Sequence, residues 1–257
     1  MIDHVSAHRF YISPERWSLR PLVLGDSEAH HCTDVLRLGV RSRIVVFNGR
    51  GAEIIAEITA IGKGRVHLKE LVSTKTEPLR CSITLAQAIP KGKNMDLIIQ
   101  KATELGASKI VLLISDRTVV QLEEGELHRK REKWKQVTIE AAKQSGQDWL
   151  PEIEGPVTPK QFFAGFDHYE LSLVASLQND ARSFKKVLAN FREQHGRRPN
   201  SALFLVGPEG DFTPAEISWA KSAGCVPVSL GPIVLRTETA AIYSLSMLAY
   251  ELQGEEV

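Results

Sequence analysis

Two strand ends in the sequence combine the residue types that a ligand-binding loop needs. Residues 203–212, LFLVGPEGDF, run from an apolar strand into GPEG at 207–210, and residues 229–241, SLGPIVLRTETAA, place RTET at 236–239 before a helix. Glycine and proline let a backbone turn sharply and approach a ligand closely. Each loop alone is typical of a plain turn or a helix N-terminus. Two such loops after two buried strands indicate one shared site.

A third loop carries positive charge. PKGKN at 90–94 follows the apolar stretch 82–89 and contains Lys91 and Lys93. These lysines are typical of a solvated loop, but beside a cofactor site they are also well placed to contact a phosphate backbone.

Several common catalytic signatures are absent from the sequence. It contains no G-x-x-x-x-G-K-[ST] loop, no early G-x-G-x-x-G, no H-E-x-x-H, no G-x-S-x-G and no Cys/His cluster with zinc spacing. The adjacent pair His30-His31 diverges by about 100° on a helix, so we interpret it as a surface or structural pair and not as metal ligands. We therefore predict no metal site.

The elements that must position the two loops alternate between strand and helix. Strand-like stretches occur at 82–89, 109–115, 170–176, 202–207 and 226–231, and helical patterns at 94–105, 126–145, 213–224 and 238–252. Such alternation predicts an α/β domain with a mostly parallel sheet. Ligands bind beyond the carboxyl ends of such strands, where the two loops lie.

The N-terminal part of the sequence is organised differently. Three strand-like stretches at 43–49, 52–61 and 64–71 are separated by glycines, and a short helical stretch spans 26–38. The polar segment STKTEP at 73–78 ends in a proline and is typical of a linker. We therefore predict a small β-rich domain at 1–72, a linker at 73–80 and a catalytic domain at 81–257.

Composition narrows the class of protein. The chain has 257 residues, 43% of them apolar and 25% charged, with a net charge of +1, which is ordinary for a globular protein. Three dispersed cysteines favour a reducing compartment over a disulfide framework. No membrane-spanning run and no signal peptide are apparent, so we expect a cytoplasmic protein.

At this level of detail the sequence resembles the RsmE family, the 16S ribosomal RNA uridine-N3 methyltransferases of the SPOUT superfamily. The resemblance covers nearly the whole chain. It is carried by AQAIPKGKNMDLIIQKATELG (86–106), AAKQSGQDWLPEI (141–153), LFLVGPEGDFTPAEI (203–217) and LGPIVLRTETAAIYSL (230–245). More loosely, residues 30–58 resemble the family's PUA-like RNA-binding domain. The chain departs from the usual pattern at Asn48, Lys143, Gln147 and Asp211.

The resemblance implies a particular architecture and cofactor. It implies a C-terminal SPOUT domain with a trefoil knot, a homodimer with each active site near the subunit interface, and S-adenosyl-L-methionine as cofactor. The substrate implied is 16S rRNA of the small ribosomal subunit. The residues implied to hold the cofactor are Leu177, Gly207, Pro208, Glu209, Gly210, Leu230, Gly231, Leu235, Arg236 and Thr237.

The expected reaction is methylation of uridine N3, whose proton must leave before or during transfer. Arg236 is the candidate for stabilising the negative charge that develops on the flanking carbonyl oxygens. Glu238 or Glu209 is the candidate proton acceptor, although either could instead orient the backbone or Arg236. The candidate RNA-binding residues are Arg9, Arg37, Arg41, Arg43, Lys91 and Lys93.

Two other classes of protein stay open at this point. A non-catalytic RNA-binding or ribosome-assembly protein on the same scaffold would bind RNA without the cofactor, and the intact GPEG and LRTET sequences count against it. A nucleotide-binding enzyme on a doubly wound sheet would act without RNA, and the missing phosphate-loop signatures count against it.

Overall fold

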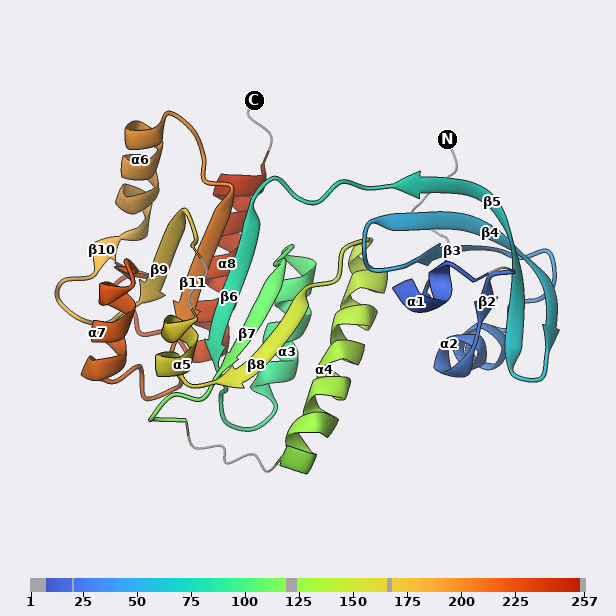
Figure 1. Ribbon diagram of the computed structural model, residues 1–257, viewed down its shortest axis with the longest axis horizontal. Coiled ribbons are helices and arrows are strands. Elements are labelled where there is room, and N and C mark those ends of the chain that lie inside the picture. Colours follow the sequence, from blue (N-terminus) through green and yellow to red (C-terminus); the bar gives the residue numbers. More distant parts are fainter. Residues whose placement is uncertain (1–7, 20, 119–123, 166–167, 255–257) are drawn as a thin grey trace. The chain divides into compact units, whose positions relative to one another are not determined.

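The computed structural model describes residues 8–19, 21–118, 124–165 and 168–254 (Figure 1). Its contacts divide the chain into two compact units. One unit contains the described residues up to Pro78 together with Ile139–Leu150, and the other contains Leu79–Thr138 and the described residues from Pro151 onward. The boundary therefore falls inside a helix, a division that the sequence does not signal.

The first unit is built on a five-stranded sheet in the order β1-β3-β4-β5-β2. Strand β1 is parallel to β3, and the other neighbours are antiparallel. The apolar core includes Phe10, Ile44, Ile54 and Val66, all fully buried. The elements are β1 (Arg9–Tyr11), α1 (Pro14–Trp17), β2 (Val23–Leu24), α2 (Asp26–His30), the π-helical turn η1 (His31–Val35), β3 (Arg43–Phe47), β4 (Ala52–Gly62) and β5 (Arg65–Lys75).

The turn between β3 and β4 follows the predicted Asn-Gly pattern. Gly49 and Gly51 have φ angles of 72° and 82°, a region that glycine enters at little cost. The side-chain oxygen of Asn48 accepts hydrogen bonds from the backbone N–H groups of Arg50 (2.8 Å) and Ala52 (3.1 Å). Asn48, a departure from the family pattern, thus stabilises a tight turn.

Polar contacts attach Ile139–Leu150 to the rest of the first unit. The Arg9 guanidinium pairs with Glu53 and, at 2.7 Å, with Asp148. The Lys143 ammonium pairs with Glu28 at 2.6 Å, and both side chains are nearly buried. The departure at Lys143 therefore has a structural role within this unit.

The second unit is built on a seven-stranded sheet in the order β10-β12-β9-β11-β6-β7-β8, and all its neighbouring strands are parallel. This confirms the predicted α/β class with a mostly parallel sheet. The strands are β6 (Ser82–Ala88), β7 (Lys109–Leu113), β8 (Glu152–Val157), β9 (Leu171–Ala175), β10 (Arg182–Ser183), β11 (Ser201–Val206) and β12 (Val226–Ser229).

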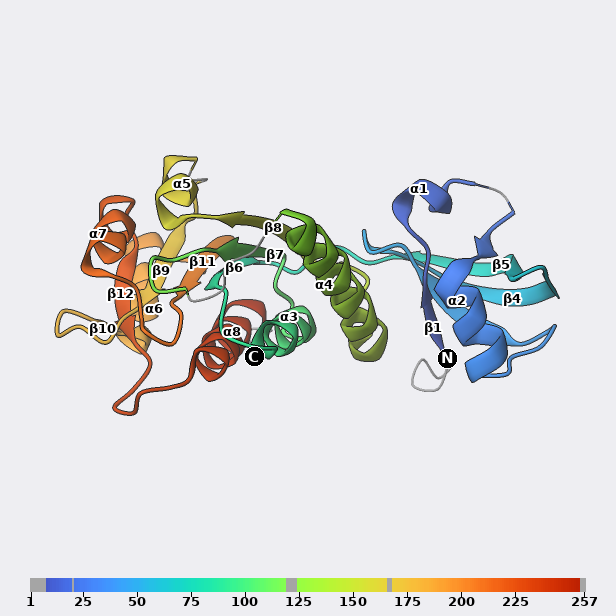
Figure 2. The same ribbon diagram turned by 90° about the horizontal axis from the view of Figure 1, so that it is seen from below.

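Helices cover both faces of this sheet, as a buried parallel sheet requires (Figure 2). One core joins the sheet to α3 (Asn94–Glu104), α6 (Phe184–His195), α8 (Thr237–Gln253) and Trp134 of α4 (Glu124–Ser145). A second core, on the other face, joins it to α5 (Pro159–Ala164) and α7 (Pro214–Ser222). Alternate residues of each strand therefore face different helices.

The sequence anticipated most elements but not all. The structure places strands or helices in all thirteen stretches we expected. Residues 73–75 were expected in the linker, but they extend β5, because they pair with Ala52, Glu53 and Ile54 of β4. Strands β1, β2, β8 and β10 and helices α1, α5 and α6 were not predicted.

Candidate functional site

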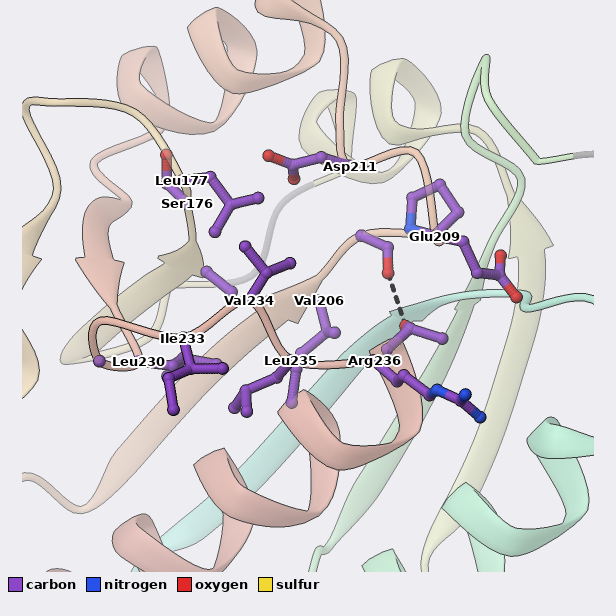
Figure 3. A pocket seen from close by; sticks show the side chains of 16 residues that line it. Ser176, Leu177, Val206, Glu209, Asp211, Leu230, Ile233, Val234, Leu235 and Arg236 are labelled. Atoms are coloured by element: carbon purple, nitrogen blue, oxygen red, sulfur yellow. Dashed lines mark hydrogen bonds between the residues drawn. The ribbon is translucent and has the colours of Figure 1, made fainter.

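A cavity of about 290 Å³ opens at the carboxyl ends of β9, β11 and β12 (Figure 3). Three chain segments line it, at 175–177, 206–211 and 230–237, and the first turn of α8 adds Ala240. Its lining is mainly apolar, with Glu209, Asp211 and Arg236 as the charged members. Both loops singled out in the sequence therefore meet at one site, at the edge of the sheet where ligands bind in this class of fold.

One buried side chain connects two of these segments. The Thr237 hydroxyl donates a hydrogen bond to the Gly207 carbonyl oxygen at 2.7 Å, drawn as a dashed line in Figure 3. The same hydroxyl accepts a hydrogen bond from the side-chain amide of Gln87 at 3.0 Å. Gln87 lies on β6 and is fully buried. The first residue of α8 thus fixes the turn after β11.

Backbone geometry explains the residues of the turn 207–212. A Cβ on Gly207 would lie 3.0 Å from the Phe212 nitrogen and 3.2 Å from an Asp211 oxygen. Asp211 has a φ of 62°, a left-handed conformation that aspartate tolerates better than most residues. Its Oδ1 accepts a hydrogen bond from the Phe212 N–H at 2.7 Å. Burial raises the pKa of Asp211, and hydrogen bonds from the backbone N–H groups of Phe212 and Leu177 oppose that rise.

The charged side chains of the site differ in how they are held. Glu209 Oε1 accepts a hydrogen bond from the Lys91 backbone N–H at 2.9 Å, so Glu209 joins the loop after β6 to the turn after β11. Arg236 is exposed and Glu238 half-exposed, and neither side chain bonds to another part of the described chain. Figure 3 shows Glu209 and Arg236 on one side of the cavity and Leu177 and Ile233 on the other.

The structure brings together nearly all the residues predicted to hold the cofactor. Gly210 is the exception; it does not line the cavity, and its carbonyl oxygen accepts a hydrogen bond from Arg117. The predicted residues that line the cavity are Leu177, Gly207, Pro208, Glu209, Leu230, Gly231, Leu235, Arg236 and Thr237. The lining residues that sequence reasoning missed are Ala175, Ser176, Val206, Asp211, Ile233, Val234 and Ala240.

The sequence carried a signal for some of the missed residues. Ile233 and Val234 are apolar residues between a Gly-Pro turn and Arg236, and both are about 70% exposed (73% and 72%). Gln87 is a fully buried amide on β6, and such a polar side chain is unusual where both faces of a sheet are covered. No local pattern marks Ala175 or Val206.

The candidate RNA-binding residues fall into two groups. Arg37, Arg41 and Arg43 are exposed in the first unit, and Lys91 and Lys93 are exposed in the second. Arg9 is different, because its side chain is only 14% exposed and is held by Glu53 and Asp148. This arrangement gives Arg9 a structural role and does not favour a phosphate contact.

The described residues contain neither a metal-ligand cluster nor a membrane-spanning helix. Among the described residues, no group of three or more His, Cys, Asp or Glu side chains is placed to hold a metal ion. His30 instead lies 3.1 Å from Asp34, one helical turn along the chain. Within the described ranges, no helix combines the length and the apolar character needed to cross a bilayer.

The parallel sheet, the cavity at its carboxyl edge and the separate β-rich unit define a class of protein. Residues 77–249 match the model of an RNA methyltransferase domain, and residues 24–71 match that of an RNA methyltransferase PUA domain. The chain therefore belongs to the RNA methyltransferase family, with an N-terminal PUA-like domain. Within it, the chain belongs to the RsmE group, because the relatives it matches are named ribosomal RNA small subunit methyltransferase E.

Two bacterial relatives match this chain along most of its length. The protein of this name from Synechocystis sp. is 33% identical over 247 residues, covering 95% of this chain and 78% of the relative. The one from Bacillus subtilis is 30% identical over 237 residues, covering 89% of this chain and 91% of the relative.

Solved structures agree as well. A methyltransferase of Legionella pneumophila, in complex with the bound cofactor SAM, is 31% identical with a TM-score of 0.85, covering 95% of this chain and 97% of the other. The ribosomal RNA small subunit methyltransferase E of Neisseria gonorrhoeae, bound to S-adenosyl methionine, is 29% identical with a TM-score of 0.81, covering 94% and 96%.

Proposed function

We propose that this chain is an S-adenosylmethionine-dependent methyltransferase that methylates N3 of a uridine in the 16S rRNA of the small ribosomal subunit. The observation that carries the proposal is the cavity formed by three loops at the carboxyl edge of the sheet. It occurs in a chain whose relatives are named as small-subunit rRNA methyltransferases and whose structural neighbours hold that cofactor.

The residues of the cavity fit this cofactor. An adenine ring needs apolar surfaces on its faces and backbone polar groups at its edge, and the cavity offers Leu230, Ile233, Val234 and Leu235 on loops with accessible backbone. Gly231 has a φ of 127° and open space where a Cβ would lie, so its backbone is free to approach a ligand. When bound, S-adenosylmethionine supplies a methyl group already activated by its sulfonium.

Arg236 is placed to stabilise the target base. Uridine N3 carries a weakly acidic proton, and its loss spreads negative charge over the two flanking carbonyl oxygens. The Arg236 guanidinium lines the cavity and has no partner in the described chain, so its donors are available to those oxygens. One preorganised donor of this kind is worth about 3 kcal/mol of transition-state stabilisation.

Glu209 is the better placed of the two candidate proton acceptors. It lines the cavity, and only its Oε1 is committed, to the Lys91 N–H. Glu238 has no partner in the described chain, but it does not line the cavity. Comparing the turnover of Glu209→Gln and Glu238→Gln separates them: the acceptor loses most of its turnover, and the other variant keeps it.

RNA would be held by both parts of the chain. We infer a PUA-like RNA-binding domain at 1–72, a linker at 73–80 whose first three residues extend β5, and a methyltransferase domain at 81–257. The PUA-like domain supplies the exposed cations Arg37, Arg41 and Arg43. The methyltransferase domain supplies Lys91 and Lys93. Arg9 is omitted because its guanidinium is occupied. A ribosomal substrate places the enzyme in the cytoplasm.

The proposal includes a trefoil knot and a homodimer. The knot is supported by the way the segment 230–237 lines one cavity with the turn after β11 and is bound to it through Thr237. The homodimer is supported by Leu177, Ile233, Val234 and Tyr250, which are apolar or aromatic side chains exposed by 65% to 81%. Exposed apolar groups of this kind are typical of association surfaces.

The test in cells uses a bacterium whose own gene for this modification is deleted. Expression of this chain should restore 3-methyluridine in nucleosides from purified 16S rRNA, measured by mass spectrometry. An Arg236→Ala chain expressed to the same level serves as the control and should restore little. Absence of 3-methyluridine with the folded, unchanged chain would contradict the proposal and favour a non-catalytic RNA-binding protein.

A further inference from the structure

Arg117 lies beside the turn 207–212 but does not line the cavity. It follows β7, and its Nη1 donates a hydrogen bond of 2.5 Å to the Gly210 carbonyl oxygen. A Cβ on Gly210 would lie 3.3 Å from Arg117 Cδ and 3.5 Å from Arg117 Cβ. The aliphatic part of Arg117 therefore packs against the glycine, and its guanidinium is fixed at the outer side of the turn.

The loop that carries Arg117 is firmly held. The Ser115 hydroxyl and the Asp116 N–H both donate to the carboxylate of Glu216, at 3.2 and 3.0 Å. Glu216 is 2% exposed and also accepts a hydrogen bond from the Thr213 N–H, as part of the capping box that begins α7. The backbone of the loop just before Arg117 is thus held by a buried carboxylate.

The surroundings of Arg117 suit an anion. Arg117 is exposed, and of its guanidinium nitrogens only Nη1 makes a hydrogen bond within the described chain, which leaves most of its side-chain donors free. Lys91 approaches the same turn, because its N–H binds Glu209, the residue before Gly210. The nearby carboxylate of Asp211 is half-buried and already accepts the Phe212 N–H.

We propose that Arg117 binds a backbone phosphate of the RNA strand that carries the target nucleotide, with Lys91 as a second cation at the same turn. A guanidinium with free, parallel donors is well suited to phosphate oxygens. Such a contact would position the strand so that the base reaches the cavity, without reading its sequence. This inference rests on the proposed function, because it takes RNA as the substrate.

A second anion could satisfy the same donors, namely the carboxylate of the cofactor's methionine part. The structure favours RNA, because Arg117 is not among the residues that line the cavity. The two sources differ in which affinity changes when the positive charge is removed. Affinity for S-adenosylmethionine measured without RNA reports on a contact to the cofactor carboxylate. The KM for RNA reports on a contact to an RNA phosphate.

The experiment compares Arg117→Gln and Arg117→Ala with the unchanged chain. Glutamine keeps a donor for the Gly210 carbonyl but removes the charge, so it separates an electrostatic from a structural role. Arg182→Ala is the matched control, because Arg182 is an exposed arginine on β10, at the far edge of the same sheet. The readouts are thermal stability, the Kd for S-adenosylmethionine by calorimetry, methyl-transfer kinetics, and the salt dependence of equilibrium RNA binding.

We expect both Arg117 variants to raise the KM for RNA by about tenfold and to keep the Kd for the cofactor within about twofold. The slope of log K against log salt should fall by about 0.7 to 0.9, the loss of one phosphate contact. Arg182→Ala should change none of these. A rise in cofactor Kd with unchanged RNA binding would assign the anion to the cofactor, and unchanged values of both would leave Arg117 with a structural role only; either result overturns the proposal.

Failure of the proposed function would look different. An unchanged chain that transfers no methyl group contradicts the enzyme assignment itself, whereas equilibrium RNA binding would still report the Arg117 contact. An active unchanged chain with a fully active Arg117→Gln contradicts this inference alone.

Discussion

Arg236 lies at the junction between the third cavity loop, 230–237, and helix α8. Arg236 is the N-cap of that helix, with φ −65° and ψ 154°, and its side chain makes no cap hydrogen bond. The backbone thus begins a helix while the side chain stays available at the cavity. The sequence left a helix N-terminus and a residue of the site as alternatives for Arg236, and in the structure this one residue both caps α8 and lines the cavity.

Replacing Arg236 with alanine should therefore affect catalysis more than folding. We expect a fall in kcat of about 100-fold or more, because one donor to a developing negative charge is lost. The free energy of unfolding should change by less than about 0.5 kcal/mol, as for other exposed side chains. Single-turnover kinetics and urea unfolding measure the two quantities. A variant with near-normal turnover would remove Arg236 from the mechanism.

Thr237 should behave in the opposite way. Thr237→Val keeps the shape but removes the donor to the Gly207 carbonyl and one of the two acceptors of the Gln87 amide nitrogen, which keeps only the Ala88 carbonyl oxygen. Unsatisfied buried groups cost about 1–3 kcal/mol each, so stability should fall measurably and cofactor affinity with it. Thr239→Val is the control, because Thr239 is exposed on the same helix. Equal effects of the two changes on urea unfolding would contradict this role for Thr237.

At the scale of elements, an exposed ion pair fixes the start of β9 to the loop after α6. Glu170 accepts hydrogen bonds from Arg197 Nη1 (2.7 Å), Arg197 Nη2 (2.9 Å) and the Asn200 N–H (2.8 Å). The Arg197 guanidinium, followed by the Asn200 N–H, lowers the pKa of Glu170 to about 2. The stabilisation is therefore present above pH 4.5, the ordinary value, and is lost as the pH falls toward 2.

Glu170→Gln should destabilise the protein at pH 7, and the difference from the unchanged chain should shrink as the pH approaches 2. The effect should be small and should weaken in high salt, because the pair is exposed. Urea midpoints at several pH values measure the difference, and Glu193→Gln on α6, also exposed, is the control. A difference that does not depend on pH would contradict this account.

The elements that the sequence predicted share strong local signals. Thr213 and Glu216 form a capping box at the start of one such element, and Asn48-Gly49 forms the turn between two others. Strand β8 was missed because its hydrophobic pattern is weak. It lies at the edge of its sheet, and none of its six residues is buried. Helix α6 did carry a pattern, with Phe184, Val187 and Phe191 on one buried face.

The sequence predicted the loops of the candidate site but not the strand residues that complete it. The Gly-Pro turns and RTET are local signals, whereas Gln87 and Ala175 enter the site through the strand order β9-β11-β6. Strand order depends on pairing between distant segments, which periodicity in one sequence does not encode. Asp211 was noted as a departure, but its φ of 62° and its place in the cavity lining appear only in the structure.

At the scale of the whole molecule, RNA affinity should depend on salt through the exposed arginines of the first unit. Arg41 and Arg43 flank the start of β3 and have no side-chain partner in the described chain. Replacing both with alanine should lower the slope of log K against log salt by about 1.5, close to two phosphate contacts.

Fluorescence titration of small-subunit RNA at several salt concentrations measures that slope. Lys160→Ala, an exposed change on α5, is the control and should leave it unchanged. An identical slope for the double variant and the unchanged chain would place the RNA contacts elsewhere.

The central claim is that the three-loop cavity serves methyl transfer to ribosomal RNA. Its most direct test incubates the purified chain with labelled S-adenosylmethionine and small ribosomal subunits that lack the modification, followed by nucleoside analysis. The account predicts label in 3-methyluridine from 16S rRNA, and about 100-fold slower labelling with Arg236→Ala. No label from a folded chain, beside an active control enzyme, would contradict it.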